Sequence, residues 1–210
     1  MKITKMTQSK KVQDRYYLDL EDGSSIKVNV ALIADYSLYT GRELSDEELQ
    51  SLKEAALSNE IKARALRMTG ARAMSRKEVT DRLTQKGADA DSAEETADWL
   101  ENLGIVNDEE YAGMIARHYS AKGYGVGKVK NELYRRGVPK EYWDAALEEI
   151  SGTDESVDKL ISLKLKNGEN DPKTIKKLTA MLLRRGFTWE EVRHGLERYR
   201  VSLEDMEYDV

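Results

Sequence analysis

Beyond residue 75, apolar side chains recur at spacings of three and four, and glycines interrupt the pattern at regular intervals. Around Gly137, apolar residues stand eight and four positions before the glycine and six, ten and thirteen positions after it. Spacings of three and four place side chains on one face of an α-helix, and glycine ends a helix because it adopts the left-handed conformation cheaply. The pattern predicts a helix–turn–helix hairpin over residues 127–150.

The same five offsets hold apolar residues around Gly87 and Gly186, which lie 50 residues before and 49 residues after Gly137. A helical stretch also precedes each hairpin, so the repeating unit has three helices. Internal repeats of this length indicate stacked helical modules. The fifteen predicted core positions are Val79, Leu83, Ala93, Ala97, Leu100, Val129, Leu133, Trp143, Leu147, Ile150, Leu178, Leu182, Val192, Leu196 and Tyr199.

The N-terminal part of the chain differs from the repeats. Residues 16–20 and 26–30 are strand-like, and Asp22-Gly23 between them is a strong hairpin signal. A two-stranded hairpin alone is only marginally stable in water. We therefore expect either that residues 3–6 add a third strand or that the hairpin packs on the neighbouring part of the chain. The pattern predicts a small antiparallel β unit, as a hairpin or with three strands.

Capping residues mark where the helices begin. Ser45 with Glu48 forms a capping box, in which serine and glutamate side chains satisfy each other's backbone amides, and it opens a helix that continues to about Thr69. Further starts are marked by Ser75 with Glu78, Asn107 with Asp108, Asp171 before Pro172, and Thr188 with Glu191.

We therefore predict a mainly α fold with three tandem three-helix repeats in an elongated array, preceded by the small β unit. The predicted boundaries are 1–44 for the β-rich extension, 45–103, 104–151 and 152–200 for repeats 1, 2 and 3, and 201–210 for an acidic tail. We expect a monomer, because stacked modules cover their own apolar faces.

Composition narrows the class of protein. The 210 residues include no cysteine, which excludes disulfides and thiolate metal sites and fits a reducing compartment. No apolar run approaches the length of a membrane span, and the first residues lack the apolar segment of a signal peptide. We expect a cytoplasmic protein that does not enter the membrane.

Charge is distributed unevenly, although the net charge is only −5. The second helices of the three repeats carry net charges of +2, +3 and +5, whereas residues 89–103 of a third helix hold six acids and no base. If like helices share a face, the array has a basic side and an acidic side, which suits an anionic groove or a mixed protein–nucleic-acid partner. The alternative is that these are ordinary solvated faces.

No catalytic set emerges from the residue types. Gly123 to Lys128 superficially resembles a phosphate-binding loop, but Val129 follows the lysine and no strand precedes the loop, so a flexible linker is favoured. His118 and His194 lie in different repeats without partners at useful spacing. The acids after Asn107 suit a helix N-terminus. We predict no catalytic, cofactor or metal residues, and a protein that is not an enzyme.

Three segments resemble the RecX family: Ser75 to Gly87, Leu103 to Ala112, and Gly123 to Gly137 with its Glu132-Leu133 pair. The resemblance runs from about residue 60 to 200, and the strand-rich leader that ends with residues 36–44 is similar to an extension found in some members. Asn107 departs from the family pattern, which commonly has aspartate there, but both residues cap helices.

The resemblance implies a regulator of the recombinase RecA that acts in homologous recombination and the SOS response. Such proteins bind the filament of RecA on single-stranded DNA and inhibit its ATPase, recombinase and coprotease activities. The basic second helices are the expected contact with RecA or DNA: Arg72, Arg76, Lys77, Arg82, Lys128, Lys130, Arg135, Arg136, Lys173, Lys176, Lys177, Arg184 and Arg185. We expect weak direct DNA binding and no cofactor.

Two other functions stay open. A helical-repeat protein could bind DNA directly, independent of RecA, although the helices after the first two turns, which would enter the major groove, are acidic. A protein-only scaffold is the third possibility. The salt dependence of DNA binding distinguishes these possibilities, because direct phosphate contacts make the affinity for bare DNA fall steeply with ionic strength.

Overall fold

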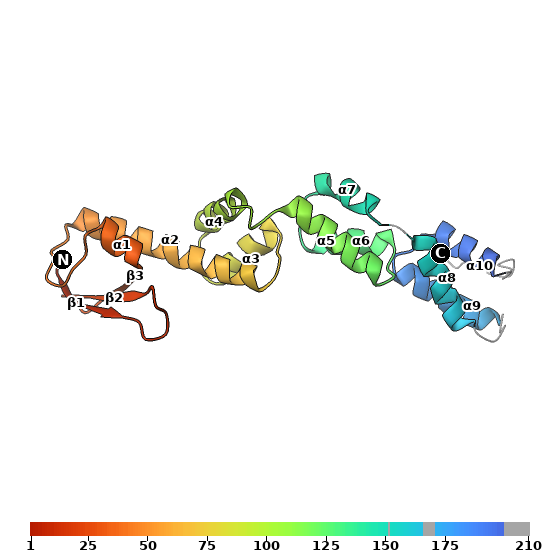
Figure 1. The fold of residues 1–210 in the computed structure, drawn as a ribbon, viewed down its shortest axis with the longest axis horizontal. Coiled ribbons are helices and arrows are strands. Elements are labelled where there is room, and N and C mark those ends of the chain that lie inside the picture. The colour runs from red at the N-terminus through yellow and green to blue at the C-terminus, as the bar shows by residue number, and fades with distance from the viewer. Residues whose placement is uncertain (151, 166–170, 200–210) are drawn as a thin grey trace. The chain divides into compact units, whose positions relative to one another are not determined.

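The computed structural model describes residues 1–150, 152–165 and 171–199 (Figure 1). The described chain forms ten α-helices, a short 3-10 helix and a three-stranded antiparallel sheet, which confirms the predicted fold class. Two compact units divide it: residues 1–72 with 79–105, and residues 73–78 with those from 106 onward. The predicted acidic tail, 201–210, lies outside the described residues.

The N-terminal sheet has the strand order β1 (Ile3–Gln8), β2 (Tyr16–Leu20), β3 (Ser25–Val28). The predicted third strand is therefore present as β1. Gly23 has a φ of +82° in the tight turn between β2 and β3, a conformation that glycine adopts at little cost. Leu18 pairs with Ile26 across the two strands, and both side chains are buried.

A long helix covers the apolar side of this sheet. The short α1 (Val30–Asp35) leads to α2 (Asp46–Ala71), which begins at the predicted capping box of Ser45 and Glu48. Leu49, Leu52 and Ala56 of α2 share one buried cluster with the strand residues. The β unit is thus stabilised by packing on α2, as a marginal sheet requires.

The later half of α2 packs with α4 (Ala90–Asn102) in the first three-helix group, which also contains α3 (Arg76–Gln85). Ala93 and Ala97 are fully buried, as their positions in the repeat predict. Trp99 is half-buried, and Lys62 Nζ lies 5.5 Å from the centre of its ring.

The second group contains α5 (Asp108–Ala121), α6 (Val126–Arg135) and α7 (Trp143–Glu148). The second helix of the hairpin predicted over residues 127–150 starts with a 3-10 turn, η1 (Lys140–Tyr142), before α7 begins. Val129 and Leu133 are completely buried, whereas Trp143 is only half-buried and donates its indole N–H to the Val138 carbonyl at 3.0 Å.

The third group contains α8 (Thr153–Lys164), α9 (Pro172–Arg184) and α10 (Trp189–Arg198). Asp171 and the Thr188–Glu191 capping box open α9 and α10 as predicted. Tyr199 was assigned to the core wrongly: it is 39% exposed, because it follows the last residue of α10, and its hydroxyl donates to the Asp158 carbonyl at 3.2 Å.

Backbone contacts join the second and third groups at the start of α6. The amides of Gly125 and Gly127 donate to the carbonyl oxygens of Arg185 and Gly186, at 3.0 and 2.9 Å. The flexible-linker interpretation of Gly123 to Lys128 is therefore wrong. The glycines allow close packing of two backbones, and the amides that a phosphate loop would offer to an anion are already bonded.

An equivalent joint forms at the start of α3. The Ser75 hydroxyl donates to the Arg136 carbonyl oxygen, and the Asp108 carboxylate accepts from the Arg76 amide at 2.9 Å. Ser75 and Gly125 occupy the same repeat position, since each stands twelve residues before a turn glycine. The turn of each following group therefore docks on the N-terminus of the preceding group's second helix.

Candidate nucleic-acid and protein interface

Four cations of α9 have no ion pair within the described part of the chain. Lys173, Lys176, Lys177 and Arg184 are all exposed, and none forms an ion pair with any residue that the structure describes. The opposite face of α9 is buried, through Ile175, Leu178 and Leu182 among others. Helical spacing therefore separates an apolar inner face from a cationic outer face.

Arg185 differs from these four residues. It is half-buried, its guanidinium carbon lies 5.3 Å from the centre of the Tyr124 ring, and its Nη1 donates to the Gly123 carbonyl at 3.3 Å. These contacts tie the third group to the second. The Arg185 side chain therefore stabilises the packing of the third group on the second, and it is less available to a partner than the four exposed cations of α9.

Glu132 organises the cations of α6. Its carboxylate, only 7% exposed, lies 3.0 Å from Lys128 Nζ and 2.6 Å from Arg135 Nη2. Burial alone would raise the pKa of Glu132, but hydrogen bonds from Arg135 and Lys128 outweigh burial and hold that pKa at about 2. The carboxylate is thus charged at neutral pH, and the two cations neutralise it.

Arg136, which caps the end of α6, lies near two carboxylates. Its side chain is 22% exposed, and it lies 3.7 Å from Glu78 and 3.5 Å from Glu132. Its Nη1 also donates to the Tyr111 hydroxyl, which in turn donates to Glu78 at 3.0 Å. Burial and the Glu78 carboxylate raise the pKa of Tyr111, so the phenol remains a donor. This network links α3, α5 and α6.

The candidate residues of the first basic segment are mixed. Lys77 and Arg82 are exposed, whereas Arg72 and Arg76 are half-buried. Arg72 caps the end of α2, and the Arg76 amide is the donor to Asp108. Lys77 lines the turn of the second group: a Cβ on Gly137 would lie 2.8 Å from its Cβ.

The predicted contact set thus divides by environment. Half-buried cations with structural contacts are Arg72, Arg76, Lys128, Arg136 and Arg185. Exposed cations are Lys77, Arg82, Lys130, Arg135, Lys173, Lys176, Lys177 and Arg184. Lys130 resembles the α9 residues, because it has no ion pair within the described part of the chain.

Sequence reasoning missed the residues that hold the cations in place. Asp108 looked like an acid at the start of its own helix, but it accepts a hydrogen bond from the first residue of α3. Glu132 was noted only as half of a motif. Its one useful signal was an acid four residues after Lys128 and three before Arg135, which places all three on one helix face.

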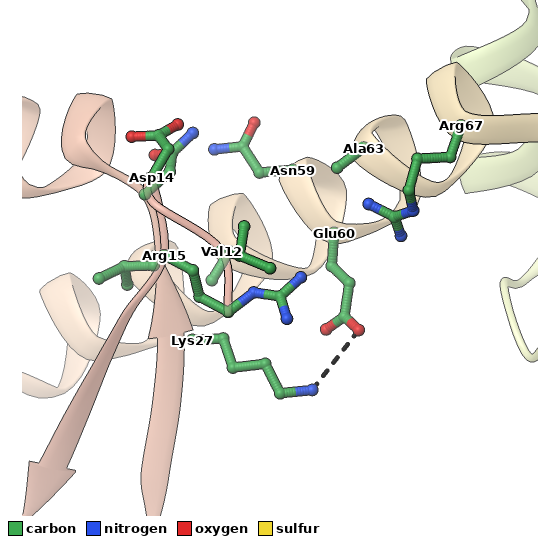
Figure 2. A pocket seen from close by; sticks show the side chains of 11 residues that line it. Val12, Asp14, Arg15, Lys27, Asn59, Glu60, Ala63 and Arg67 are labelled. Atoms are coloured by element: carbon green, nitrogen blue, oxygen red, sulfur yellow. Dashed lines mark ion pairs between the residues drawn. The ribbon is translucent and has the colours of Figure 1, made fainter. Parts of the chain in front are cut away.

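A pocket of about 140 Å³ lies between the β unit and α2, and charged side chains stand at its edge (Figure 2). Two of its charged groups have partners within the protein: Lys27 Nζ lies 3.5 Å from Glu60, and the Asp14 carboxylate accepts from the Val30 amide at 3.2 Å. Its lining contains no nucleophile with an adjacent base. The Lys27–Glu60 ion pair therefore helps to hold β3 against α2.

The described residues contain no cluster of three or more metal-ligating side chains, and His118 and His194 are both exposed. In the same part of the chain, no helix combines the length and apolarity needed to cross a bilayer.

Comparison with known proteins identifies the repeats. Residues 62–100 match the model of the first three-helix domain of RecX, and residues 107–147 match that of the second. A regulatory protein RecX from Chlorobium limicola is 32% identical over 145 residues, covering 67% of this chain and 89% of the relative. One from Clostridium tetani is 26% identical and covers 96% of this chain and 95% of the relative.

Solved structures show the same fold. A crystal structure of a regulatory protein RecX superposes with a TM-score of 0.73 at 19% identity, over 93% of this chain and 98% of that one. RecX from Lactobacillus salivarius gives a TM-score of 0.62 at 21% identity, over 69% of this chain and 97% of that one. The relatives are named as regulatory proteins, not as enzymes. With its order of helices, its two matched domains and these relatives, the chain belongs to the RecX family.

Proposed function

We propose that this protein binds the filament of RecA on single-stranded DNA and inhibits its ATPase, recombinase and coprotease activities. Family membership supports a regulatory role, and the observation that carries the proposal is the unpaired cationic face of α9. Lys173, Lys176 and Lys177 offer their charge to a partner, since none of them forms an ion pair with a described residue. An anionic filament surface, DNA phosphate or acidic protein, is the matching partner.

Repetition of the helical group suits a filament. Each group presents a second helix, so several modest contacts combine within one chain, and linked contacts strengthen one another without a deep pocket. We propose that the groups wedge across adjacent recombinase subunits, and that the filament then loses its active geometry and disassembles.

The test is the DNA-dependent ATPase of the recombinase from the same organism, measured while this protein is titrated in. One variant replaces Lys173, Lys176 and Lys177 with glutamine. The matched control replaces three exposed lysines of the N-terminal unit with glutamine, giving the same change in charge: Lys10, Lys11 and Lys53. Circular dichroism checks that both variants fold.

We expect wild type and the control to inhibit well below one protein per recombinase subunit, and the α9 variant to need several-fold more protein. Inhibition that survives the α9 variant would keep the function and reject this contact face. No inhibition by equimolar wild type would reject the function.

The unpaired lysines of α9 also fit direct DNA binding independent of RecA. That alternative predicts tight binding to bare DNA whose affinity falls steeply with salt. Weak binding to bare DNA together with tight binding to the filament would favour the proposed function.

A further inference from the structure

Tyr134 is the most exposed large hydrophobic side chain among the described residues, at 76%. It lies on α6, whose buried face is formed by Val129, Glu132 and Leu133. Its ring and hydroxyl form no hydrogen bond or ring contact with any residue that the structure describes. The ring therefore contributes nothing visible to the core of the second group, and a folding role does not explain it.

Two cations lie near Tyr134 in the sequence of α6. Lys130 lies one helical turn before Tyr134, and Arg135 follows it directly. Lys130 is exposed and unpaired with any described residue, and Arg135 is 65% exposed although it contacts Glu132. An exposed aromatic ring thus shares its helix face with the exposed Lys130, and Arg135 adds a second positive charge beside that face.

The third group repeats part of this arrangement, an exposed apolar side chain followed by an arginine. Leu183 occupies the same repeat position as Tyr134, three residues before its turn glycine, and is 42% exposed. It neighbours Arg184 on the outer face of α9, which also carries Lys176. Two successive second helices therefore present a large exposed side chain directly before an arginine at the same repeat position.

A ring between cations matches the chemistry of a single nucleic-acid strand. Cations track the phosphates, and an aromatic face stacks on bases, which are accessible only where they are unpaired. A duplex would offer the charge but hide the base faces, and an acidic protein surface would offer nothing that needs a flat ring. Charge complementarity and the ring together favour the single strand.

We propose that Tyr134 stacks on an unpaired base of single-stranded DNA while Lys130 holds a neighbouring phosphate. This inference rests on the proposed function, in which single-stranded DNA is part of the filament. It adds that the protein contacts the bases as well as the backbone, so its binding depends on the presence of bases without reading their sequence.

The test compares two labelled oligomers of equal length, one of thymidine and one of abasic sugar-phosphate, by fluorescence anisotropy at low salt with no recombinase present. The full-length variants are Tyr134→Ala and Tyr134→Phe. Tyr39→Ala is the matched control, because Tyr39 is 60% exposed and lies in the N-terminal unit. Circular dichroism establishes that each variant folds.

Wild type should bind the thymidine oligomer more tightly than the abasic one. Tyr134→Ala should weaken thymidine binding by about 5- to 100-fold and leave abasic binding unchanged, since stacking on one base is worth that much. Tyr134→Phe and Tyr39→Ala should behave as wild type.

Equal binding of both oligomers by wild type, binding of neither, or full thymidine binding by Tyr134→Ala would each overturn the inference. If Tyr134→Ala reduces only the inhibition of the recombinase, the ring contacts protein and the inference is also wrong. If base-dependent binding holds while wild type does not inhibit the recombinase, the proposed function fails and the stacking site stands.

Discussion

The backbone amide of Gly127 donates a hydrogen bond to the carbonyl oxygen of Gly186 over 2.9 Å, joining the start of α6 to the turn between α9 and α10. Such contact between two main chains leaves no room for side chains. A Cβ on Gly186 would lie 2.8 Å from Lys128 Cβ, and one on Gly125 would lie 2.6 Å from the Gly186 carbonyl carbon. The glycine-rich segment is therefore a packing surface between the second and third groups.

Replacing Gly125 with alanine tests this joint. Gly125 has a φ of −81°, which alanine adopts without strain, so any cost comes from the clash with the Gly186 backbone. We expect a loss of about 1–3 kcal/mol in the free energy of unfolding, the usual cost of overpacking. Urea denaturation followed by circular dichroism measures it.

Gly70→Ala is the control for that substitution. Gly70 lies in α2, and no atom would come within 4 Å of its Cβ. Alanine there should stabilise the chain by up to about 1 kcal/mol, because it favours helix more than glycine does. Equal effects of the two substitutions would contradict the close-packed joint.

Glu132→Gln should destabilise the protein in a pH-dependent way. The folded-state pKa of Glu132, about 2, lies below its ordinary value of 4.5, so its charged form stabilises the fold above the ordinary value. That stability is lost as pH falls from 4.5 toward 2. The shift corresponds to about 3 kcal/mol at most.

The measurement is the difference in unfolding free energy between wild type and Glu132→Gln, from pH 6 down to the lowest pH at which both proteins still fold. We expect a clear difference at neutral pH that shrinks through the acid range. A difference that does not change with pH would mean that the charge of Glu132 contributes nothing and that the cations are held by other contacts.

Local signals in the sequence were sufficient for most of the fold. The capping boxes at Ser45 and Thr188 and the hairpin at Gly23 form where they were predicted, since each depends on a few neighbouring residues. Helical periodicity found the buried faces of α6 and α9 for the same reason. The prediction that Tyr199 is buried was wrong, because a periodic pattern does not show where the helix ends.

The candidate site was harder to predict, because it depends on which charges neutralise one another across groups. Lys128 and Lys130 look alike in the sequence, but Glu132 pairs with the first and no described residue pairs with the second. The role of Asp108 requires knowing that the start of α3 lies beside it. Contacts between distant residues carry no local signal.

Asp108→Ala should weaken the joint between α5 and the start of α3. The Asp108 carboxylate is buried and accepts from the Arg76 amide at 2.9 Å, so its loss leaves that helix start without this cap. We expect a cost of about 1–2 kcal/mol. Amide hydrogen exchange at Arg76 should speed up in Asp108→Ala. It should not change in Glu109→Ala, a neighbouring exposed acid, and the same exchange rate in both variants would contradict the cap.

Lys130→Gln and Arg136→Gln should separate binding from stability. Lys130 is exposed and unpaired within the described chain, so its replacement should change the unfolding free energy by less than about 0.5 kcal/mol. Arg136 links Tyr111, Glu78 and Glu132, so its replacement should cost about 2 kcal/mol or more.

If Lys130 holds a phosphate, its replacement should weaken DNA or filament binding and lower the slope of log affinity against log salt by about 1. Arg136→Gln should leave that slope unchanged in the fraction that remains folded, because the Arg136 guanidinium is already paired with Glu78 and Glu132 inside the protein. Anisotropy titrations at several salt concentrations measure both slopes. A reduced slope for Arg136→Gln with an unchanged slope for Lys130→Gln would reverse the assignment, and the contact face would then lie at the joint between α3 and α6 instead of on the outer face of α6.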